Sequence, residues 1–575
     1  MRPTLLFKSG FAFYSYSARL HSFWDFFAME TRRNFLKNVT SVTCTLCASS
    51  CRRLWADGVS PLKPLFLPGE YSRINATERT YHISCEIDMF EQYDSLLDIW
   101  KDAGVTDAWL GVWYYGHFPY PWDKFDYWLF QLKEHGFRPH LGSVPFCHGG
   151  GSLDPLDSEF PNLPPKHWKT AKRWNGSENW GWSWHSPADV EGAEAIKTLY
   201  KRYGAFNYFL DDDFRFSSSP AEIGGCICDE CKADFLKTSG LDASRWNETL
   251  DDVRNNVDTP LLRAWVDYFC DRLTQCFITY RDAVPQVDVG IMVMYMGCER
   301  GGIRLDDYRD ALFRVGEGGF SDSWFESTKF KTIELFSSLF HRRFCDPGRA
   351  FSETTVFPER KLSAENMAAK LSVSTISDVR NTCFMSGLRA IPPEYWPILS
   401  KRMALEKKFH AKLVGQKLRG PFKHYYGPAS RYLGGENAYS LFLALGTPFE
   451  VCDEIPKDGW TFLSDPDANE VERGGLSSPG STLIARVRSS SDRFIEVPED
   501  IDALFKFRRS IVSELQKNSI PYVEEETPIV LAWYPDVKLA YLWNLNNSEI
   551  QLHVRAGEKR IATKLEGRGS ALIEI

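Results

Sequence analysis

The 575-residue sequence lacks several features that would place it in a simple class. It has no run of about 18 or more apolar residues, so no segment is predicted to be a transmembrane helix. Its net charge of −8 provides none of the basic footprint that nucleic-acid binding requires. It contains neither an internal repeat nor a low-complexity segment. With 43% hydrophobic and 25% charged residues the chain is globular, and about 150 residues per domain predicts three or four domains.

The N-terminus is predicted to be an export leader. Residues 29–37 read Met-Glu-Thr-Arg-Arg-Asn-Phe-Leu-Lys, which resembles a twin-arginine signal, and a small-residue cleavage point lies near Ala56. We expect Met29 to be the biological start and the mature protein to be periplasmic or secreted. Residues 1–56 carry a net charge of +6, which leaves −14 on the remainder. The alternative is a basic, disordered N-terminus. Residues 48–51 form a poor lipoprotein box, so no lipid anchor is expected.

After an N-terminal extension at 57–80, residues 81–415 alternate short apolar runs with amphipathic stretches. Eight strand–helix units in this span predict an α/β fold of the (β/α)8 TIM-barrel type. A doubly wound sheet is the alternative, but no Gly-x-Gly-x-x-Gly follows any predicted strand. The eight predicted strands are His82–Glu86, Ala108–Trp113, Arg138–Val144, Phe206–Leu210, Val287–Met294, Gly319–Trp324, Ala350–Thr354 and Thr382–Met385.

The rest of the chain predicts two smaller domains. Residues 416–525 alternate again, which indicates a smaller α/β domain of flavodoxin or amidotransferase type. From 526 to 575 the pattern is all-β, with turns at Asn-Asn and Gly, so we expect a C-terminal β-sandwich-like domain. No catalytic constellation occurs at 416–500, and we expect this part to have a structural or oligomerisation role.

The carboxyl ends of the predicted strands, where barrel enzymes carry their active sites, are acidic and aromatic. Carboxylates at two different strand ends are what glycoside hydrolysis requires, and flat aromatic rings can cover the apolar faces of sugars. An aromatic loop at 174–185 with four Trp is a further candidate for sugar contact. The expected substrate-binding residues are Glu86, Trp113, Tyr114, Asp211, Asp212, Arg215, Trp182 and Trp324.

The acidic run and a following cysteine segment together resemble a known family. Phe209-Leu210-Asp211-Asp212-Asp213-Phe214, followed by Cys226-Ile-Cys228-Asp-Glu-Cys231, is similar to segments of glycoside hydrolase family 42 β-galactosidases. The resemblance implies a retaining mechanism in which Asp213 is the acid/base and Glu353 the nucleophile. The family has Asn and Glu where this chain has Asp212 and Asp213. The Asp213 carboxyl is one methylene shorter and must reach farther.

The cysteine segment predicts a structural zinc. Cys226, Cys228 and Cys231 lie within six residues, and thiolates at this spacing can bind one Zn²⁺ at about 2.3 Å. The resembled family takes its fourth Cys from a stretch that here contains His185 and no Cys. His185 or Cys147 could complete the site. Reduced thiols or a single disulfide are the alternative.

Together these features predict a secreted glycoside hydrolase that cleaves a galactoside or related oligosaccharide without a catalytic cofactor. A catalytically silent carbohydrate-binding barrel is one alternative. Another is a metal-dependent hydrolase with the Asp211–Asp213 run as its cation site, which the lack of a nearby His-x-His disfavours. The α/β domain of the resembled family supports trimers, which leaves a homotrimer or a homodimer as the expected oligomers of this chain.

Overall fold

The computed structural model describes the chain from Pro64 onward, with several internal gaps. The described residues are 64–66, 69–145, 165, 167–172, 178–211, 214, 223–293, 296–315, 317–387, 389–433, 439–477, 480–486 and 494–575. The predicted leader therefore lies outside the described residues. Among the helices described, none is long and apolar enough to cross a membrane.

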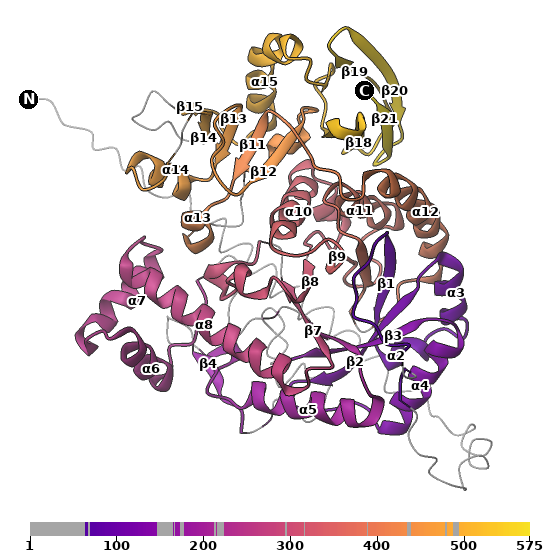
Figure 1. Cartoon of the computed structure of the whole chain (residues 1–575), viewed down its shortest axis with the longest axis vertical. Coiled ribbons are helices and arrows are strands. Elements are labelled where there is room, and N and C mark those ends of the chain that lie inside the picture. The colour runs from indigo at the N-terminus through magenta and orange to yellow at the C-terminus, as the bar shows by residue number, and fades with distance from the viewer. Residues whose placement is uncertain are drawn as a thin grey trace, which may run out of the picture.

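A closed parallel barrel forms the larger part of the molecule (Figure 1), and the predicted (β/α)8 fold is confirmed. The barrel closes where β1 pairs with β10, with Thr80 opposite Asn381. In order around the barrel the strands are β1 (Thr80–Cys85), β10 (Asn381–Met385), β9 (Ala350–Thr355), β8 (Leu312–Val315), β7 (Asp288–Val293), β6 (Asn207–Leu210), β3 (Arg138–Val144) and β2 (Asp107–Tyr114).

Helices connect successive strands and cover the outside of the barrel. Those of the barrel are α2 (Ile87–Phe90), α3 (Leu96–Ala103), α4 (Trp122–Glu134), α5 (Ala188–Tyr203), α6 (Asp229–Ser239), α7 (Trp246–Asn255), α8 (Pro260–Ala283), α9 (Asp322–Phe325), α10 (Thr328–His341), α11 (Ala364–Ile376) and α12 (Trp396–Leu413). Short 3-10 turns, at 243–245, 299–301, 305–308, 342–344 and 393–395, complete these connections, and β4 (Thr170–Lys172) pairs antiparallel with β5 (Glu178–Trp182).

One predicted strand was wrong. The sixth barrel strand is β8 at Leu312–Val315, and the predicted range Gly319–Trp324 is instead a loop that leads into α9. Arg314 stands in the middle of β8, so the strand does not show the apolar pattern that the prediction relied on. Gly319 has a φ of +61°, which is incompatible with a continuous strand.

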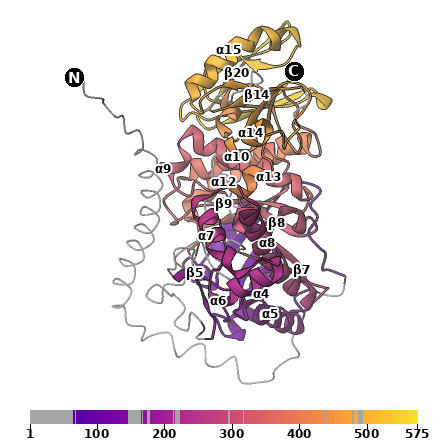
Figure 2. The same ribbon diagram turned by 90° about the vertical axis from the view of Figure 1, so that its left-hand side faces the viewer.

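Two smaller sheet systems follow the barrel and lie beyond α10–α12 at one end of the molecule (Figures 1 and 2). The first is a parallel sheet in the order β12-β11-β13-β14-β15, and the second consists of two antiparallel sheets, β16-β19-β20 and β17-β18-β21. The strands are β11 (Phe422–Tyr425), β12 (Phe449–Cys452), β13 (Trp460–Leu463), β14 (Thr482–Ala485), β15 (Phe494–Glu496), β16 (Tyr522–Val523), β17 (Ile529–Tyr534), β18 (Leu539–Asn544), β19 (Ile550–Ala556), β20 (Lys559–Leu565) and β21 (Ser570–Glu574). The helices are α13 (Pro428–Leu433), α14 (Asp465–Glu472) and α15 (Ile501–Lys517), with 3-10 turns at 440–444 and 535–537.

The last two sheets pack face to face as a small sandwich. Val523 and Leu552 of one sheet and Leu531 and Leu542 of the other belong to a single buried apolar cluster. The sandwich is attached to the barrel helices by buried polar contacts. The Tyr534 hydroxyl donates to the Ile376 carbonyl at 3.1 Å, and the Lys331 ammonium donates to the Leu545 carbonyl at 2.7 Å.

Candidate active site

The predicted nucleophile lies on the seventh barrel strand, β9. Phe351 of this strand contacts the rings of Trp109 and Phe209, with centroids 5.7 and 5.0 Å away, although their strands do not pair with β9. Phe351 therefore points into the barrel, and the alternation along a strand directs Glu353 inward as well, one layer nearer the carboxyl end. The Glu353 side chain is 2% exposed and accepts a hydrogen bond of 2.7 Å from the Thr355 hydroxyl.

A buried ion pair links the ends of β6 and β8 across the barrel interior. Arg314 Nη2 lies 2.5 Å from Asp211 Oδ1, and Nη1 donates to Oδ2 at 3.0 Å. The guanidinium is completely buried, so this fork-to-carboxylate geometry holds both groups in place. Because Arg314 compensates the charge of Asp211, a second cation at that carboxylate is disfavoured.

Asp211 and Glu353 face the same region of the barrel interior. The Cys383 thiol on β10 stands opposite Glu353 in the strand register. Burial raises the pKa of Cys383 to about 12, and Arg314 opposes this rise while the Asp211 and Glu353 carboxylates add to it. Arg314, which pairs with Asp211, also donates to the Met385 sulfur on β10 at 3.3 Å, so the Asp211 and Glu353 carboxylates lie around a common centre.

Glu86 and Tyr114 form the part of the site that β1 and β2 contribute. The Tyr114 hydroxyl donates a short hydrogen bond to Glu86, which directly follows β1. The Tyr114 hydroxyl oxygen and the Glu86 carboxylate oxygens occupy the space beside Gly111, so a Cβ at position 111 would collide with them. Burial, reinforced by the Glu86 charge, raises the pKa of Tyr114 well above its usual range, so the hydroxyl keeps its proton and orients the carboxylate.

The other predicted site residues fall into three groups. Asp212, Asp213 and Arg215 lie outside the described residues, and for Trp182 only the backbone, in β5, is described. Trp113 is buried and packs edge-on against Phe118 at 4.9 Å. Trp324 follows no barrel strand, because it belongs to α9, where its ring stacks on Phe330 at 5.5 Å.

Sequence reasoning missed a buried charge cluster next to Glu353. Glu317 follows β8, Glu334 lies on α10 and Lys370 lies on α11, and the Lys370 ammonium is 3.4 and 3.3 Å from the two carboxylates. The one available signal was Glu317, which lies two residues past the end of the true sixth strand. The misplaced strand prediction hid both Glu317 and Arg314.

The three predicted cysteines come together beside α6. Their sulfur atoms lie within 4.8 Å of one another, and Cys228 Sγ is 3.3 Å from Cys231 Sγ. The predicted fourth ligand, His185, is not part of this group of possible ligand atoms among the described residues. The Ser183 hydroxyl lies there instead, 3.4 Å from Cys231 Sγ and 3.8 Å from Cys228 Sγ.

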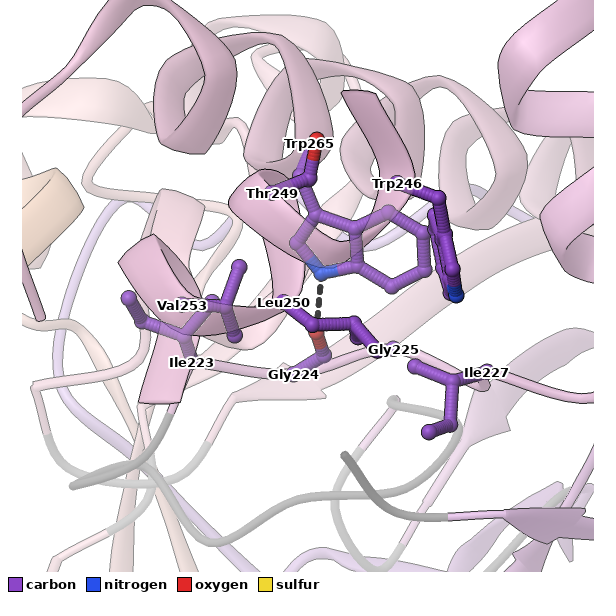
Figure 3. A pocket seen from close by; sticks show the side chains of 9 residues that line it. All are labelled: Ile223, Gly224, Gly225, Ile227, Trp246, Thr249, Leu250, Val253 and Trp265. Atoms are coloured by element: carbon purple, nitrogen blue, oxygen red, sulfur yellow. Dashed lines mark hydrogen bonds between the residues drawn. The ribbon is translucent and has the colours of Figure 1, made fainter. Parts of the chain in front are cut away.

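A small pocket lies next to this cysteine segment (Figure 3). Trp265 closes it and donates from Nε1 to the Gly224 carbonyl at 2.9 Å, so the indole anchors the loop before Cys226. None of the described residues that line the pocket is charged, and it offers no group for acid–base chemistry. The residues that line the pocket are Ile223, Gly224, Gly225, Ile227, Trp246, Thr249, Leu250, Val253 and Trp265.

A second buried polar cluster lies at the opposite, amino-terminal end of the strands. Asp107 accepts hydrogen bonds of 2.8 Å from His140 and 2.9 Å from Arg138, and His82 accepts one of 3.2 Å from the Trp109 indole. Burial lowers the pKa of His82 to about 4, so its imidazole is neutral. Arg138 already compensates Asp107, and polar groups at this end of a barrel serve stability.

The sequence matches no protein-family model and no curated protein. Solved structures do resemble the chain. A β-galactosidase from Rahnella sp. has a TM-score of 0.56 at 10% identity, over 90% of this chain and 100% of that chain. A catalytic mutant of a GH42 β-galactosidase from G. stearothermophilus has a TM-score of 0.58 at 10% identity, over 87% and 98%. A β-galactosidase from Bacillus circulans has a TM-score of 0.55 at 11% identity, over 87% and 100%. The chain therefore has the fold of the GH42 β-galactosidases, as the sequence resemblance implied.

Proposed function

We propose that the protein is a secreted, retaining glycoside hydrolase that acts on a galactoside or a related oligosaccharide. Glu353 is the nucleophile that attacks the anomeric carbon, and Asp213 protonates the leaving oxygen and later activates water. Glu86, Tyr114 and Asp211 line the same end of the barrel and hold the sugar hydroxyls. The sugar identity rests on the names of the structural neighbours alone, which act on β-galactosides.

The position of Glu353 carries this proposal. A buried carboxylate that points inward near the carboxyl end of the seventh strand, and receives a hydrogen bond from Thr355, is held in one orientation. A carboxylate in this place can reach a sugar bound over the barrel mouth. The neighbouring Asp211–Arg314 ion pair fixes the facing wall of the site.

A panel of chromogenic glycosides, assayed with and without a chelator, tests the proposal. We expect turnover of at least one β-galactoside or related sugar, unchanged by the chelator. A chelator-sensitive activity would favour the metal-dependent alternative. Binding of a sugar without turnover of any member of the panel would favour the silent carbohydrate-binding barrel.

The cysteine group fits a structural zinc. Three thiols converge, as thiolate ligation requires, and a hydrogen bond from Cys231 lowers the pKa of Cys226 so that one thiolate is already favoured. Cys226, Cys228 and Cys231 would hold the ion, with the Ser183 hydroxyl beside the fourth position. Bound zinc would fasten the start of α6 to the loop before α5.

We therefore expect about one zinc per chain in freshly purified protein, measured by elemental analysis. Cys228→Ser should lose the metal and lower the melting temperature. Cys452→Ser is the matched control, because Cys452 is a partly exposed thiol outside the group, and it should keep the zinc. Wild-type protein with far less than one zinc per chain would contradict this assignment.

Export is tested by conservative substitution in the leader. The double variant Arg32→Lys/Arg33→Lys keeps the charge of residues 32 and 33 but removes the arginine pair that the export machinery reads. We expect it to stay in the cytoplasmic fraction, whereas Arg52→Lys/Arg53→Lys, a second arginine pair outside the motif, should be exported normally. Normal export of the first variant would show that the twin-arginine interpretation is wrong.

A further inference from the structure

Behind Glu353 lies a buried cluster of two carboxylates and one ammonium group. The Lys370 ammonium is 3.4 Å from Glu317 Oε2 and 3.3 Å from Glu334 Oε1. The Lys370 and Glu334 side chains are 0% exposed and that of Glu317 is 1% exposed. Groups so far from water keep their charges only when other charges compensate them.

The surrounding chain holds the Lys370 ammonium in one place. It donates a hydrogen bond of 2.8 Å to the Gly318 carbonyl, and the rings of Phe320 and Phe325 both lie 5.6 Å from its nitrogen. Gly319 is in the left-handed region, with φ +61°, and a Cβ there would collide with the Glu334 carboxylate. The loop after β8 is therefore built around this ammonium group.

The register of the strands places the cluster beside Glu353. Val315, the last residue of β8, pairs with Ser352 of β9. Glu353 directly follows Ser352, and Glu317 lies two residues past Val315, so both lie toward the carboxyl ends of neighbouring strands. Ser374 of α11 donates to Ser352 at 2.8 Å, which fixes α11 directly behind β9. Lys370 lies one helical turn before Ser374, toward the carboxyl end of the strands.

The charges do not balance without a bound proton. Three buried carboxylates, those of Glu317, Glu334 and Glu353, face a single ammonium group. Burial raises the pKa of Glu317 well above its usual range; Lys370 opposes this rise, and the Glu334 and Glu353 charges add to it. Burial likewise raises the pKa of Glu334 to about 7, against the lowering effect of Lys370. The carboxylates raise the pKa of Lys370 although its burial acts in the opposite direction, so the ammonium stays charged.

We propose that Lys370 is a positioning residue for catalysis, because its ammonium group, with the proton held by Glu317 and Glu334, keeps the nearby Glu353 ionised. The inference rests on the proposed function, in which Glu353 is the nucleophile. A protonated Glu353 cannot attack, so the cluster sets the lowest pH at which the site works. Glu334 is the adjustable member, since its protonation frees the ammonium charge for Glu353.

Other titratable and charged groups near the cluster come from α10, from β10 and from the ends of β6 and β8. Lys331 on α10 faces Glu334, but it is engaged with the Leu545 carbonyl at 2.7 Å, and burial lowers its pKa to about 8. On β10 the Cys383 thiol adjoins Glu353, and beyond it the Asp211–Arg314 pair is internally compensated. Among the described residues, Lys370 is thus the cation that Glu317, Glu334 and Glu353 share.

Two substitutions in the cluster, with different expected effects, test the inference. Lys370→Met removes the positive charge, so Glu353 should take up its proton at higher pH and the acidic limb of kcat/KM should move upward by about one pH unit or more. Glu334→Gln mimics the neutral form that Glu334 takes below about pH 7, so it should leave the acidic limb nearly in place. Lys331→Met is the matched control, a buried lysine on the neighbouring helix whose loss should leave the limb nearly in place.

A titration of carboxyl-carbon NMR signals separates this inference from the proposed function, because it needs no turnover. The Glu353 signal, assigned with Glu353→Gln, should move upward in pH in Lys370→Met and stay in place in Glu334→Gln. If Lys370→Met fails to fold, Lys370→Gln, which removes the charge but keeps a hydrogen-bond donor, carries the same test. An unmoved Glu353 titration in the Lys370 variant, or a kcat/KM lowered equally at every pH, would make Lys370 merely structural and overturn the inference. Absence of any glycosidase activity alongside the moved titration would overturn the proposed function alone.

Discussion

Glu353→Ala is expected to abolish glycoside turnover, with a loss in kcat on the order of 10⁵, the size of effect that follows removal of a covalent nucleophile. No other described carboxylate lies at the same place on the seventh strand. The variant should still bind sugar, because the Asp211–Arg314 pair and the Glu86–Tyr114 pair do not depend on Glu353. Calorimetric binding and thermal unfolding would show that the fold is intact.

Azide gives this experiment a stereochemical readout. In Glu353→Ala a small anion can enter the space of the lost carboxylate and attack a substrate with a good leaving group, which yields a glycosyl azide of inverted configuration. Glu326→Ala is the matched control, since Glu326 lies at the end of α9, where it pairs with Arg568 at 3.3 Å and is 47% exposed. Wild-type activity in Glu353→Ala, or its loss in Glu326→Ala, would refute the assignment.

The barrel was predictable because its strands and helices keep distinct hydrophobic periods. Seven of the eight strand predictions overlap the strands of the structure. Strand β8 was missed since Arg314 interrupts a run of only four residues. The charge of Arg314 is compensated by Asp211, which directly follows β6. The spacing of the two residues in the sequence gives no sign of this pairing.

The sequence could predict only those candidate site residues that lie at the ends of barrel strands. Glu86, Tyr114, Asp211 and Glu353 do lie at the carboxyl end of the barrel, as the strand-end argument expected. Lys370 was invisible to the same argument because it lies on α11, a helix buried on nearly every side. A lysine on a helix normally predicts a solvent-exposed face, and only the folded structure shows that it faces carboxylates instead.

Asp213→Ala is expected to slow the enzyme selectively, according to the leaving group. Substrates that need protonation of the leaving oxygen should lose about 10²–10⁴-fold in kcat/KM, the usual contribution of a general acid. Substrates with strongly acidic leaving groups should lose little in the first step and accumulate the glycosyl-enzyme, because the same carboxyl activates water in the second step. A steady-state assay over a leaving-group series, with a burst measurement, shows both effects.

The described neighbours of Asp213 shape this expectation. The Asp211 amide donates to the Ser143 carbonyl at 2.6 Å and the Phe214 amide to the Met292 carbonyl at 2.8 Å, so the residues on either side are anchored to β3 and β7. Because Arg314 compensates Asp211, we expect the repulsion that raises the proton affinity of Asp213 to come mainly from its sequence neighbour Asp212. We expect the Asp213 and Glu353 carboxyls to be separated by about 5–5.5 Å, as retention requires.

Azide again distinguishes the roles of the two residues. In Asp213→Ala it needs no general base, so it should accelerate breakdown of the glycosyl-enzyme and yield a glycosyl azide of retained configuration, opposite to the product from Glu353→Ala. Asp213→Glu restores the carboxyl length of the resembled family and should keep the leaving-group dependence of the wild type. A uniform loss over the whole leaving-group series in Asp213→Ala, without azide acceleration, would mean that another group supplies the proton. The two-carboxylate mechanism would then need a different acid.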